Sequence, residues 1–351
     1  MADIDIRKSG RAGRITLTRP EALNALTYEM CLAIHAALET WRADSGVDLV
    51  VLDGAGDRAF CAGGDIAQMY RTGSTGDFDY GQRFWRDEYR MNAAIAEYPK
   101  PIVSFMHGFV MGGGVGLGCH GTYRIVDTET RMAMPEAGIG LIPDVGGTLL
   151  LARAPGCIGE YLGLTGARMG PDDAILAGFA DLLIPRGVWP ALIAELERSG
   201  DPACLAPSAQ PPPPGTLREQ RASIDRLFRG ESLPEISAAL RTEPSDLAHK
   251  AYTAMVRNSP LSMACTLALI RQLRAQGPTI RAALAQEYRF TWRAMEQGDF
   301  LEGIRAAIID KDRQPLWQHQ DMNLPGAAVA AMLEPLGQNE LTFTTAEGAP
   351  S

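Results

Sequence analysis

Hydrophobic and polar residues alternate at the start of the chain, and the spacing then changes to that of a helix. Ile4 and Ile6 have polar neighbours, and residues 13–18 alternate again after a short turn, which predicts an opening β-hairpin. Thr27, a typical N-cap residue, precedes apolar residues at helical spacing, and we expect an amphipathic helix that ends near Arg42. The apolar positions of this helix are Met30, Ile34, Leu38 and Trp41.

Short apolar runs and helical stretches then alternate along the chain. We expect strands at residues 48–52, 101–105 and 122–126, and a helix over residues 80–98. A glycine-rich turn at residues 112–116 leads into a further helix. Strands that alternate with helices through short connections are typical of the α/β fold class.

The pattern changes in the second half of the chain. Runs typical of strands mostly vanish beyond about Gly159, and residues 216–310 have helical spacing almost throughout. Residues 201–215 contain six prolines, which excludes a helix there and indicates an extended linker or surface loop. We therefore place a boundary near residue 205, between a core of residues 1–205 and a mainly helical region of residues 206–351.

The composition is that of an ordinary globular protein and excludes several functional classes. Of the 351 residues, 33 are lysine or arginine and 42 are aspartate or glutamate, so the net charge is −9 and no nucleic-acid partner is expected. No apolar run reaches the roughly 18 residues that cross a bilayer, and the polar N-terminus does not have the pattern of a signal peptide. The six cysteines form no C-x-x-C pair, and the five histidines have no metal-ligand spacing. We therefore expect a cytoplasmic protein with reduced thiols, no membrane partner and no metal.

Two glycine-rich segments follow predicted strands. The first is residues 60–66, and the second is residues 111–118, which contain five glycines. Small residues let backbone N–H groups approach a ligand closely, and a helix N-terminus presents free N–H groups to an anion. A plain glycine turn in the first segment and tight helix packing in the second are the alternatives. The second segment is neither a Walker loop nor a dinucleotide fingerprint, since no Gly-Lys-Ser/Thr and no supporting acidic residue follow.

Two carboxyl groups lie in an otherwise uncharged stretch. Glu136 and Asp144 are the charged residues within positions 132–151, among glycine, proline and apolar residues. Carboxyl groups in such surroundings tend to be desolvated acids and bases or partners of backbone amides. A helix-start carboxylate for Glu136 and a turn residue for Asp144 are the structural alternatives.

Several segments in combination resemble a known family. They are RPEALNAL (19–26), CAGGDI (61–66), GGGVG (112–116) after KPIVSFMHG (100–108), and MPE (134–136) with GLIPDVGG (140–147). This combination resembles the crotonase, or enoyl-CoA hydratase/isomerase, superfamily. The branch of 3-hydroxyisobutyryl-CoA hydrolases is the most similar, through FWRDEYRMN (84–92), MGGGVGLGCHG (111–121), AMPEAGIGLIPDVGG (133–147) and DFLEGIRAAIIDKDRQPLW (299–317).

The resemblance implies a spiral of ββα units with a helical C-terminal region, and a coenzyme A thioester as the substrate. It implies that the backbone N–H groups of Gly64 and Gly113 form an oxyanion hole for the thioester carbonyl. It also implies that Asp65 and Ile66 line the bound CoA moiety, and that no separate cofactor is needed. Relatives are often trimers or hexamers, so a homo-oligomer stays open for this chain.

The resemblance further implies acidic substrate-site residues at Glu88, Glu136 and Asp144. Hydratases of the family use two glutamates, and this chain has Gly116 where the second one would stand. We therefore expect hydrolysis of a short 3-hydroxyacyl-CoA, with 3-hydroxyisobutyryl-CoA of valine breakdown as the substrate. Glu136 would activate water or form an anhydride, and Asp144 would orient the reacting groups or move the proton. Glu88 would bind the substrate hydroxyl, the alternative being a charge on an exposed helix face.

Two other functions stay open from the sequence. An enoyl-CoA hydratase or isomerase on the same scaffold is the first, because an isomerase needs only one base and Gly116 does not exclude it. A catalytically silent acyl-CoA-binding protein is the second, and the retained carboxyl groups argue against it.

Overall fold

The computed structural model describes residues 3–343, and their packing separates two compact units. Unit 1 contains both β-sheets, whereas unit 2 is built from helices and their connections. Each unit draws on three stretches of chain, so this division differs from the boundary near residue 205 that the sequence suggests. Unit 1 is formed by the described residues of Met1–Asp65, Arg90–Ala133 and Arg168–Arg218, and unit 2 by those of Ile66–Tyr89, Met134–Ala167 and Glu219–Ser351.

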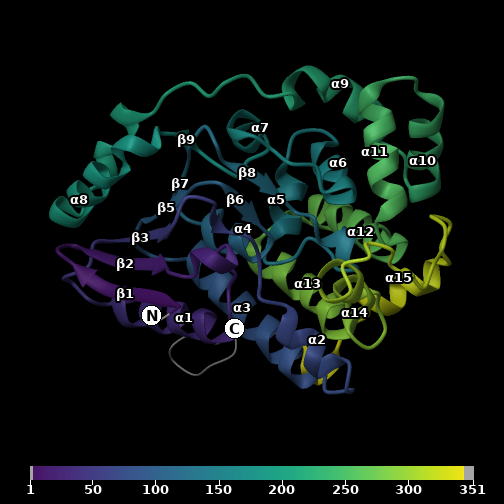
Figure 1. The fold of residues 1–351 in the computed structure, drawn as a ribbon, viewed down its shortest axis with the longest axis horizontal. Coiled ribbons are helices and arrows are strands. Elements are labelled where there is room, and N and C mark those ends of the chain that lie inside the picture. Colours follow the sequence, from purple (N-terminus) through teal and green to yellow (C-terminus); the bar gives the residue numbers. More distant parts are fainter. Residues whose placement is uncertain (1–2, 344–351) are drawn as a thin grey trace. The chain divides into compact units, whose positions relative to one another are not determined.

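The larger sheet of unit 1 has six strands in the order β1-β2-β3-β5-β7-β9 (Figure 1). Strands β1 and β2 form the predicted antiparallel hairpin, and every later pair in this order is parallel. Strand β5 is buried along its whole length, as expected for a parallel strand covered on both faces. The strands are β1 (Ile4–Ser9), β2 (Ala12–Leu17), β3 (Leu49–Gly54), β5 (Ile102–Met106), β7 (Tyr123–Val126) and β9 (Leu182–Leu183).

Strand β9 is missing from the sequence-based prediction, because two residues are too few to show a strand period. It pairs in parallel with β7 and so extends the large sheet. Helix α8 (Trp189–Ser199) follows it and packs on this sheet. The buried cluster that joins them includes Leu49, Val51, Val103, Phe105, Ile125, Trp189, Leu192 and Leu196.

The smaller sheet of unit 1 has three parallel strands, β4 (Ala59–Cys61), β6 (Phe109–Met111) and β8 (Arg131–Ala133). Along the chain, β3, β5 and β7 of the large sheet are each followed by one strand of the small sheet. This repeat, with helices between the strand pairs, is the ββα pattern that the resemblance implies. The two glycine-rich segments follow β4 and β6, which are neighbours in the small sheet.

Two predicted helices of the first half are confirmed, and a third differs from the prediction. Helix α1 (Tyr28–Arg42) begins after Thr27, whose hydroxyl oxygen accepts a hydrogen bond from the Met30 N–H at 3.2 Å. Helix α3 (Asp79–Ala96) matches the helix expected over residues 80–98. Helix α4 (Gly113–Gly118) consists of the glycine-rich segment itself, whereas we expected a turn that leads into a helix.

Helices dominate the second half, as predicted. Residues 201–215, the predicted linker or surface loop, contain no α-helix but two short 3₁₀ turns, Pro202–Cys204 and Ala206–Ser208, which the sequence did not predict. Proline is tolerated in the first turn of such elements, where its missing N–H is not needed. The helices are α7 (Pro171–Leu176) in unit 1, α9 (Leu217–Leu227), which begins in unit 1, and in unit 2 α2 (Ala67–Gly73), α5 (Gly147–Arg153), α6 (Ile158–Thr165), α10 (Leu233–Thr242), α11 (Asp246–Arg257), α12 (Pro260–Gln276), α13 (Ile280–Ala294), α14 (Phe300–Ile304) and α15 (Gly326–Leu333).

Candidate active site

The two glycine-rich segments come together inside unit 1. Because β4 and β6 are parallel neighbours, their carboxyl ends lie at the same edge of the small sheet. A Cβ atom on Gly114 would lie 2.1 Å from the carbonyl oxygen of Cys61, so the start of α4 approaches the end of β4 very closely. Tight packing therefore explains Gly114, and this packing also places the two segments side by side.

The N–H groups of Gly64 and Gly113 lie outside the hydrogen bonds that fix these segments. The Leu26 N–H donates a hydrogen bond to the Gly63 carbonyl at 2.9 Å, and the Leu26 carbonyl accepts one from the Asp65 N–H at 2.8 Å. These two bonds lie on either side of Gly64 and do not use the Gly64 N–H. Gly113 is the first residue of α4, a position whose N–H has no acceptor within the helix. As far as residues 3–343 show, both donors are available for a ligand oxygen, and their joint action as an oxyanion hole stays a prediction.

We expect the replacement of Gly114 by alanine to destabilise unit 1. The new Cβ would lie 2.1 Å from a backbone oxygen that belongs to a buried strand, so the strand or the helix must shift. Such overpacking typically costs about 1–3 kcal/mol, measured as the free energy of unfolding in urea. Gly187→Ala is the matched control, since a Cβ at Gly187 meets nothing within 4 Å. Equal losses in the two variants would contradict the close approach.

Asp65 and Ile66 follow directly on Gly64, and both are half-buried. The Asp65 carboxylate accepts a hydrogen bond from the Arg19 guanidinium at 3.1 Å, which fixes its direction. Ile66 is the N-cap residue of α2 and keeps a helical backbone conformation. Their predicted contact with the CoA moiety stays a prediction.

The three predicted acids, Glu88, Glu136 and Asp144, all belong to unit 2, and all are buried, with 4%, 5% and 5% of their surface exposed. Glu88 lies on α3, so its alternative reading as a charge on an exposed helix face is wrong. Glu136 opens the 3₁₀ turn η2 (Glu136–Ile139), and Asp144 follows Pro143 in the connection to α5. Buried carboxyl groups are costly to a fold, so their collection here calls for a chemical reason.

Burial raises the pKa of all three carboxyl groups. The pKa of Asp144 rises to about 7, although the hydrogen bond from the Tyr89 hydroxyl to Asp144 Oδ2, at 2.8 Å, favours the ionised form. Burial raises the pKa of Glu136 and of Glu88 well above the ordinary value, and the charge of Asp144 raises both further. The three groups therefore influence one another within one desolvated region of unit 2.

One oxygen of Glu136 is buried without a hydrogen-bond partner. Oε2 receives no hydrogen bond from any side chain or backbone group in residues 3–343. Buried polar atoms are nearly always paired, and an exception marks strain, a catalytic role or a place for a bound molecule. This oxygen is thus available to a water molecule or a substrate atom.

Tyr89 and Glu287 join this region of unit 2, and sequence reasoning missed both. Tyr89 lies within the resembling segment 84–92, but a buried tyrosine reads as a packing residue. Glu287 lies on α13, far along the chain from Asp144, and yet burial and, to a smaller extent, the charge of Asp144 raise the pKa of its carboxyl. The available signal was a charge on the apolar face of α13, since Ala283, Leu284 and Tyr288 on that face are all buried.

We expect the stability of the fold to decrease from about pH 4 to about pH 7 because of Asp144. The pKa of this carboxyl is about 7 in the folded chain against 3.8 for an ordinary aspartate, so over this interval the folded state holds a proton that the unfolded state has released. Linkage then makes the free energy of unfolding fall as pH rises. Asp144→Asn should remove this part of the slope in urea unfolding, whereas Asp246→Asn, whose side chain is 98% exposed, should keep it. If the free energy of unfolding still falls with pH to the same extent in Asp144→Asn, the raised pKa of Asp144 is not its cause.

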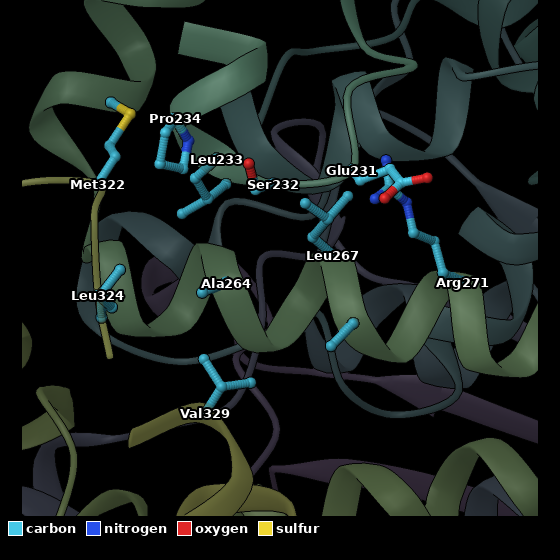
Figure 2. A pocket seen from close by; sticks show the side chains of 11 residues that line it. Glu231, Ser232, Leu233, Pro234, Ala264, Leu267, Arg271, Met322, Leu324 and Val329 are labelled. Carbon is cyan, nitrogen blue, oxygen red and sulfur yellow. The ribbon is translucent and has the colours of Figure 1, made fainter. Parts of the chain in front are cut away.

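Unit 2 also contains a pocket of about 200 Å³ that is separate from the acids (Figure 2). Its walls are mainly apolar, and its charged lining residues are Glu231 and Arg271 at one end. Arg271 donates a hydrogen bond to the Gly230 carbonyl, so one of its N–H groups already has a partner. The remaining lining residues are Ser232, Leu233, Pro234, Ala264, Leu267, Ala268, Met322, Leu324 and Val329.

Within residues 3–343, no group of three or more histidine, cysteine, aspartate or glutamate side chains is arranged to hold a metal ion. No helix in the described part of the chain combines the length and the apolar character that crossing a bilayer requires. All six cysteines are free thiols.

Comparison with known proteins identifies the class. The family model described as Enoyl-CoA hydratase/isomerase matches residues 12–333, and the fold is the α/β arrangement of ββα units with C-terminal helices found in crotonase structures. The chain belongs to this family and is therefore a crotonase-family acyl-CoA enzyme.

Two curated relatives are named as 3-hydroxyisobutyryl-CoA hydrolases. A mitochondrial 3-hydroxyisobutyryl-CoA hydrolase of Danio rerio is 39% identical over 328 residues, which cover 90% of this chain and 85% of that protein. The 3-hydroxyisobutyryl-CoA hydrolase 1 of Arabidopsis thaliana is 39% identical over 322 residues, which cover 87% of this chain and 84% of that protein.

Two solved structures are also similar to this chain. A crystal structure described as an enoyl-CoA hydratase from Rhodobacter sphaeroides is 57% identical, with a TM-score of 0.95 over 97% of this chain and 100% of that one. A second, described as a carnitinyl-CoA dehydratase from Mycobacterium thermoresistibile, is 41% identical, with a TM-score of 0.93 over 99% and 100%.

Proposed function

We propose that this chain hydrolyses the thioester bond of a short 3-hydroxyacyl-CoA, with 3-hydroxyisobutyryl-CoA as its substrate and valine breakdown as its setting. The observation that carries the proposal is the group of buried carboxyls in unit 2, in which one oxygen of Glu136 has no hydrogen-bond partner among the described residues. The names of the curated relatives at 39% identity support the same substrate. A cytoplasmic location remains our prediction, although the Danio rerio relative is described as mitochondrial.

The reaction assigns a role to each group. Water attacks the thioester carbon, the carbonyl oxygen gains negative charge, and the N–H groups of Gly64 and Gly113 stabilise it. Glu136 takes the proton of the attacking water. The carbon–sulfur bond then breaks, and the proton passes to the leaving CoA sulfur, which gives a free acid and a thiol. Direct attack by Glu136, with hydrolysis of the resulting anhydride by water, yields the same products.

The raised pKa values fit this chemistry. Because the pKa of Glu136 lies well above the ordinary value, its ionised form is a stronger base than an exposed glutamate. Asp144, with a pKa of about 7, is able to hold or release a proton near neutral pH, and so to orient the reacting groups or move the proton.

Helix α4 favours hydrolysis over hydration. Addition of water to a double bond in this family uses two glutamates, and α4 (Gly113–Gly118) has no titratable side chain, with Gly116 where the second would stand. Hydrolysis needs one base that activates water and a group that stabilises the oxyanion, and our proposal assigns these roles to Glu136 and to the N–H groups of Gly64 and Gly113.

Glu88 supports a hydroxylated acyl group. Burial, and then the charge of Asp144, raises the pKa of its carboxyl well above the ordinary value, which favours the protonated form, and a protonated carboxyl is able to donate a hydrogen bond to a substrate hydroxyl. A saturated acyl chain would offer this buried group no such hydrogen bond, so it would gain less binding free energy.

Enoyl-CoA hydration is the second candidate function. The observation in its favour is the 57% identity to a structure described as an enoyl-CoA hydratase. Hydration and isomerisation leave the thioester intact, so the two candidates differ in whether free CoA appears.

The test is CoA release from a panel of short saturated and 3-hydroxylated acyl-CoA esters, measured as free thiol. We expect kcat/KM to be highest for 3-hydroxyisobutyryl-CoA, and we expect Glu88→Leu, which removes the hydrogen-bonding group, to reduce the preference for hydroxylated esters. If no ester releases thiol and an enoyl-CoA is converted, the function is hydration and not hydrolysis.

A further inference from the structure

We propose that Glu287 is a positioning residue, whose carboxyl group fixes the turn that presents Asp144. Its significance for catalysis rests on the proposed function, because that function assigns Asp144 to the reaction. Glu287 touches no reacting atom in this proposal and acts through the backbone of residues 146–148.

The turn after Asp144 has an unusual backbone. The Gly147 N–H donates to the Asp144 carbonyl at 2.7 Å and closes the turn. Both central residues have positive φ, 54° at Val145 and 80° at Gly146. Glycine adopts this conformation freely, but a β-branched residue does so rarely because its side chain crowds the backbone. A strained residue of this kind persists only where surrounding contacts hold it.

Glu287 supplies such contacts. Its Oε2 accepts the Gly146 N–H at 2.8 Å, and its Oε1 accepts the Thr148 N–H at 3.0 Å and the Thr148 hydroxyl. One fully buried carboxyl group thus binds the backbone on both sides of Gly147. It also caps the start of α5, where the N-cap residue Gly146 has no side chain to do so.

The same helix contacts Tyr89, the hydrogen-bond partner of the Asp144 side chain. Thr291 lies one turn after Glu287 on α13, and its hydroxyl oxygen is 3.4 Å from the Tyr89 hydroxyl, which donates to Asp144 Oδ2 at 2.8 Å. The Tyr288 ring packs edge-on against the Tyr89 ring, with centroids 6.1 Å apart. Helix α13 therefore acts on the surroundings of Asp144 in two places, at the backbone of residues 146–148 and at Tyr89, the partner of its carboxyl group.

Glutamine cannot replace Glu287 in this arrangement. Both carboxyl oxygens accept hydrogen bonds from backbone donors, whereas glutamine has one oxygen and one NH₂ group. In either orientation the NH₂ group would face the N–H of Gly146 or of Thr148. Glu287→Gln is therefore a nearly isosteric change that removes one of the two backbone anchors.

A double-mutant cycle tests the proposal. Glu287→Gln, Asp144→Asn and the double variant are compared with the wild type by CoA release from 3-hydroxyisobutyryl-CoA. We expect Glu287→Gln to lower kcat about 10- to 100-fold with little change in KM, since misplacing a reacting group acts on the chemical step. In a chain that already carries Asp144→Asn, we expect Glu287→Gln to cause no further loss of kcat. If the fold-losses of kcat from the two single substitutions multiply in the double variant, Glu287 does not act through Asp144, and the proposal is overturned.

Amide hydrogen exchange of residues 144–149 separates this inference from the proposed function, because it needs no activity. Exchange at Gly146 and Thr148 should be faster in Glu287→Gln, and unchanged in the matched control Glu296→Gln, which lies on the surface. Unchanged exchange in Glu287→Gln would overturn the inference even if hydrolysis is established. Faster exchange in a chain that releases no CoA would retain the structural role and refute the proposed function.

A second variant covers the case in which Glu287→Gln does not fold. Thr148→Val removes only the hydroxyl that donates to Glu287 Oε1 and keeps the backbone N–H. We expect a smaller loss of kcat, about two- to fivefold, that again disappears in the Asp144→Asn background. A loss of the same size in both backgrounds would contradict the proposal.

Discussion

Replacement of Glu136 by glutamine lowers kcat for CoA release by about 10²–10⁴-fold, the range expected for loss of a general base. Glutamine keeps the size of the side chain but is unable to accept the proton of an attacking water or to attack the thioester. The buried position, 5% exposed, limits rescue by bulk water. The measurement is steady-state thiol release at saturating substrate.

Stability separates this loss from misfolding. The pKa of Glu136 is raised by burial, so ionisation of this carboxyl destabilises the folded state as pH rises, and a neutral glutamine avoids that cost. We therefore expect Glu136→Gln to be at least as stable as the wild type near neutral and alkaline pH. Glu129→Gln, on the surface, is the matched control and should retain full activity. Turnover within a few-fold of the wild type in Glu136→Gln would remove Glu136 from the mechanism.

Replacement of Gly113 by proline lowers kcat/KM by about 10²–10³-fold, or about 2.7–4 kcal/mol, because it deletes one donor of the proposed oxyanion hole. Gly113 is the first residue of α4, the helical position where proline is best tolerated and where the N–H has no acceptor within the helix. The measurement is kcat/KM for thiol release, with the melting temperature recorded for each variant.

Gly113→Ala is the control for this substitution, since it adds a side chain at the same place and keeps the N–H. We expect the proline variant to lose far more activity than the alanine variant. Equal losses would mean that space at residue 113, and not its N–H, is what the reaction requires.

The sequence predicted the parts of the fold whose pattern is local. The opening hairpin and helix α1 follow from periods of two and 3.6 residues and from the cap at Thr27, and the structure confirms them. Strand β9 and the 3₁₀ turns near Pro202 and Pro207 escaped prediction because each is too short to show a period.

The residues of the candidate site were easier to predict from the sequence than the contacts that bring them together. From the residues alone, the segments around Gly64 and Gly113 were two separate glycine turns, and only the pairing of β4 with β6 makes them neighbours. The sequence left open whether Glu88 lies on an exposed helix face, and its burial in the structure excludes that alternative. Glu287 lies outside any motif, because its partners, Gly146 and Thr148, are brought to it by tertiary packing alone.

The most direct test is to follow one sample of wild-type enzyme with 3-hydroxyisobutyryl-CoA by two signals at once. Free thiol reports cleavage of the carbon–sulfur bond, and enoyl absorbance reports loss of water from an intact thioester. We predict one equivalent of thiol for each substrate consumed and no enoyl product. Enoyl-CoA that forms while the thiol signal stays at the background rate would contradict the account.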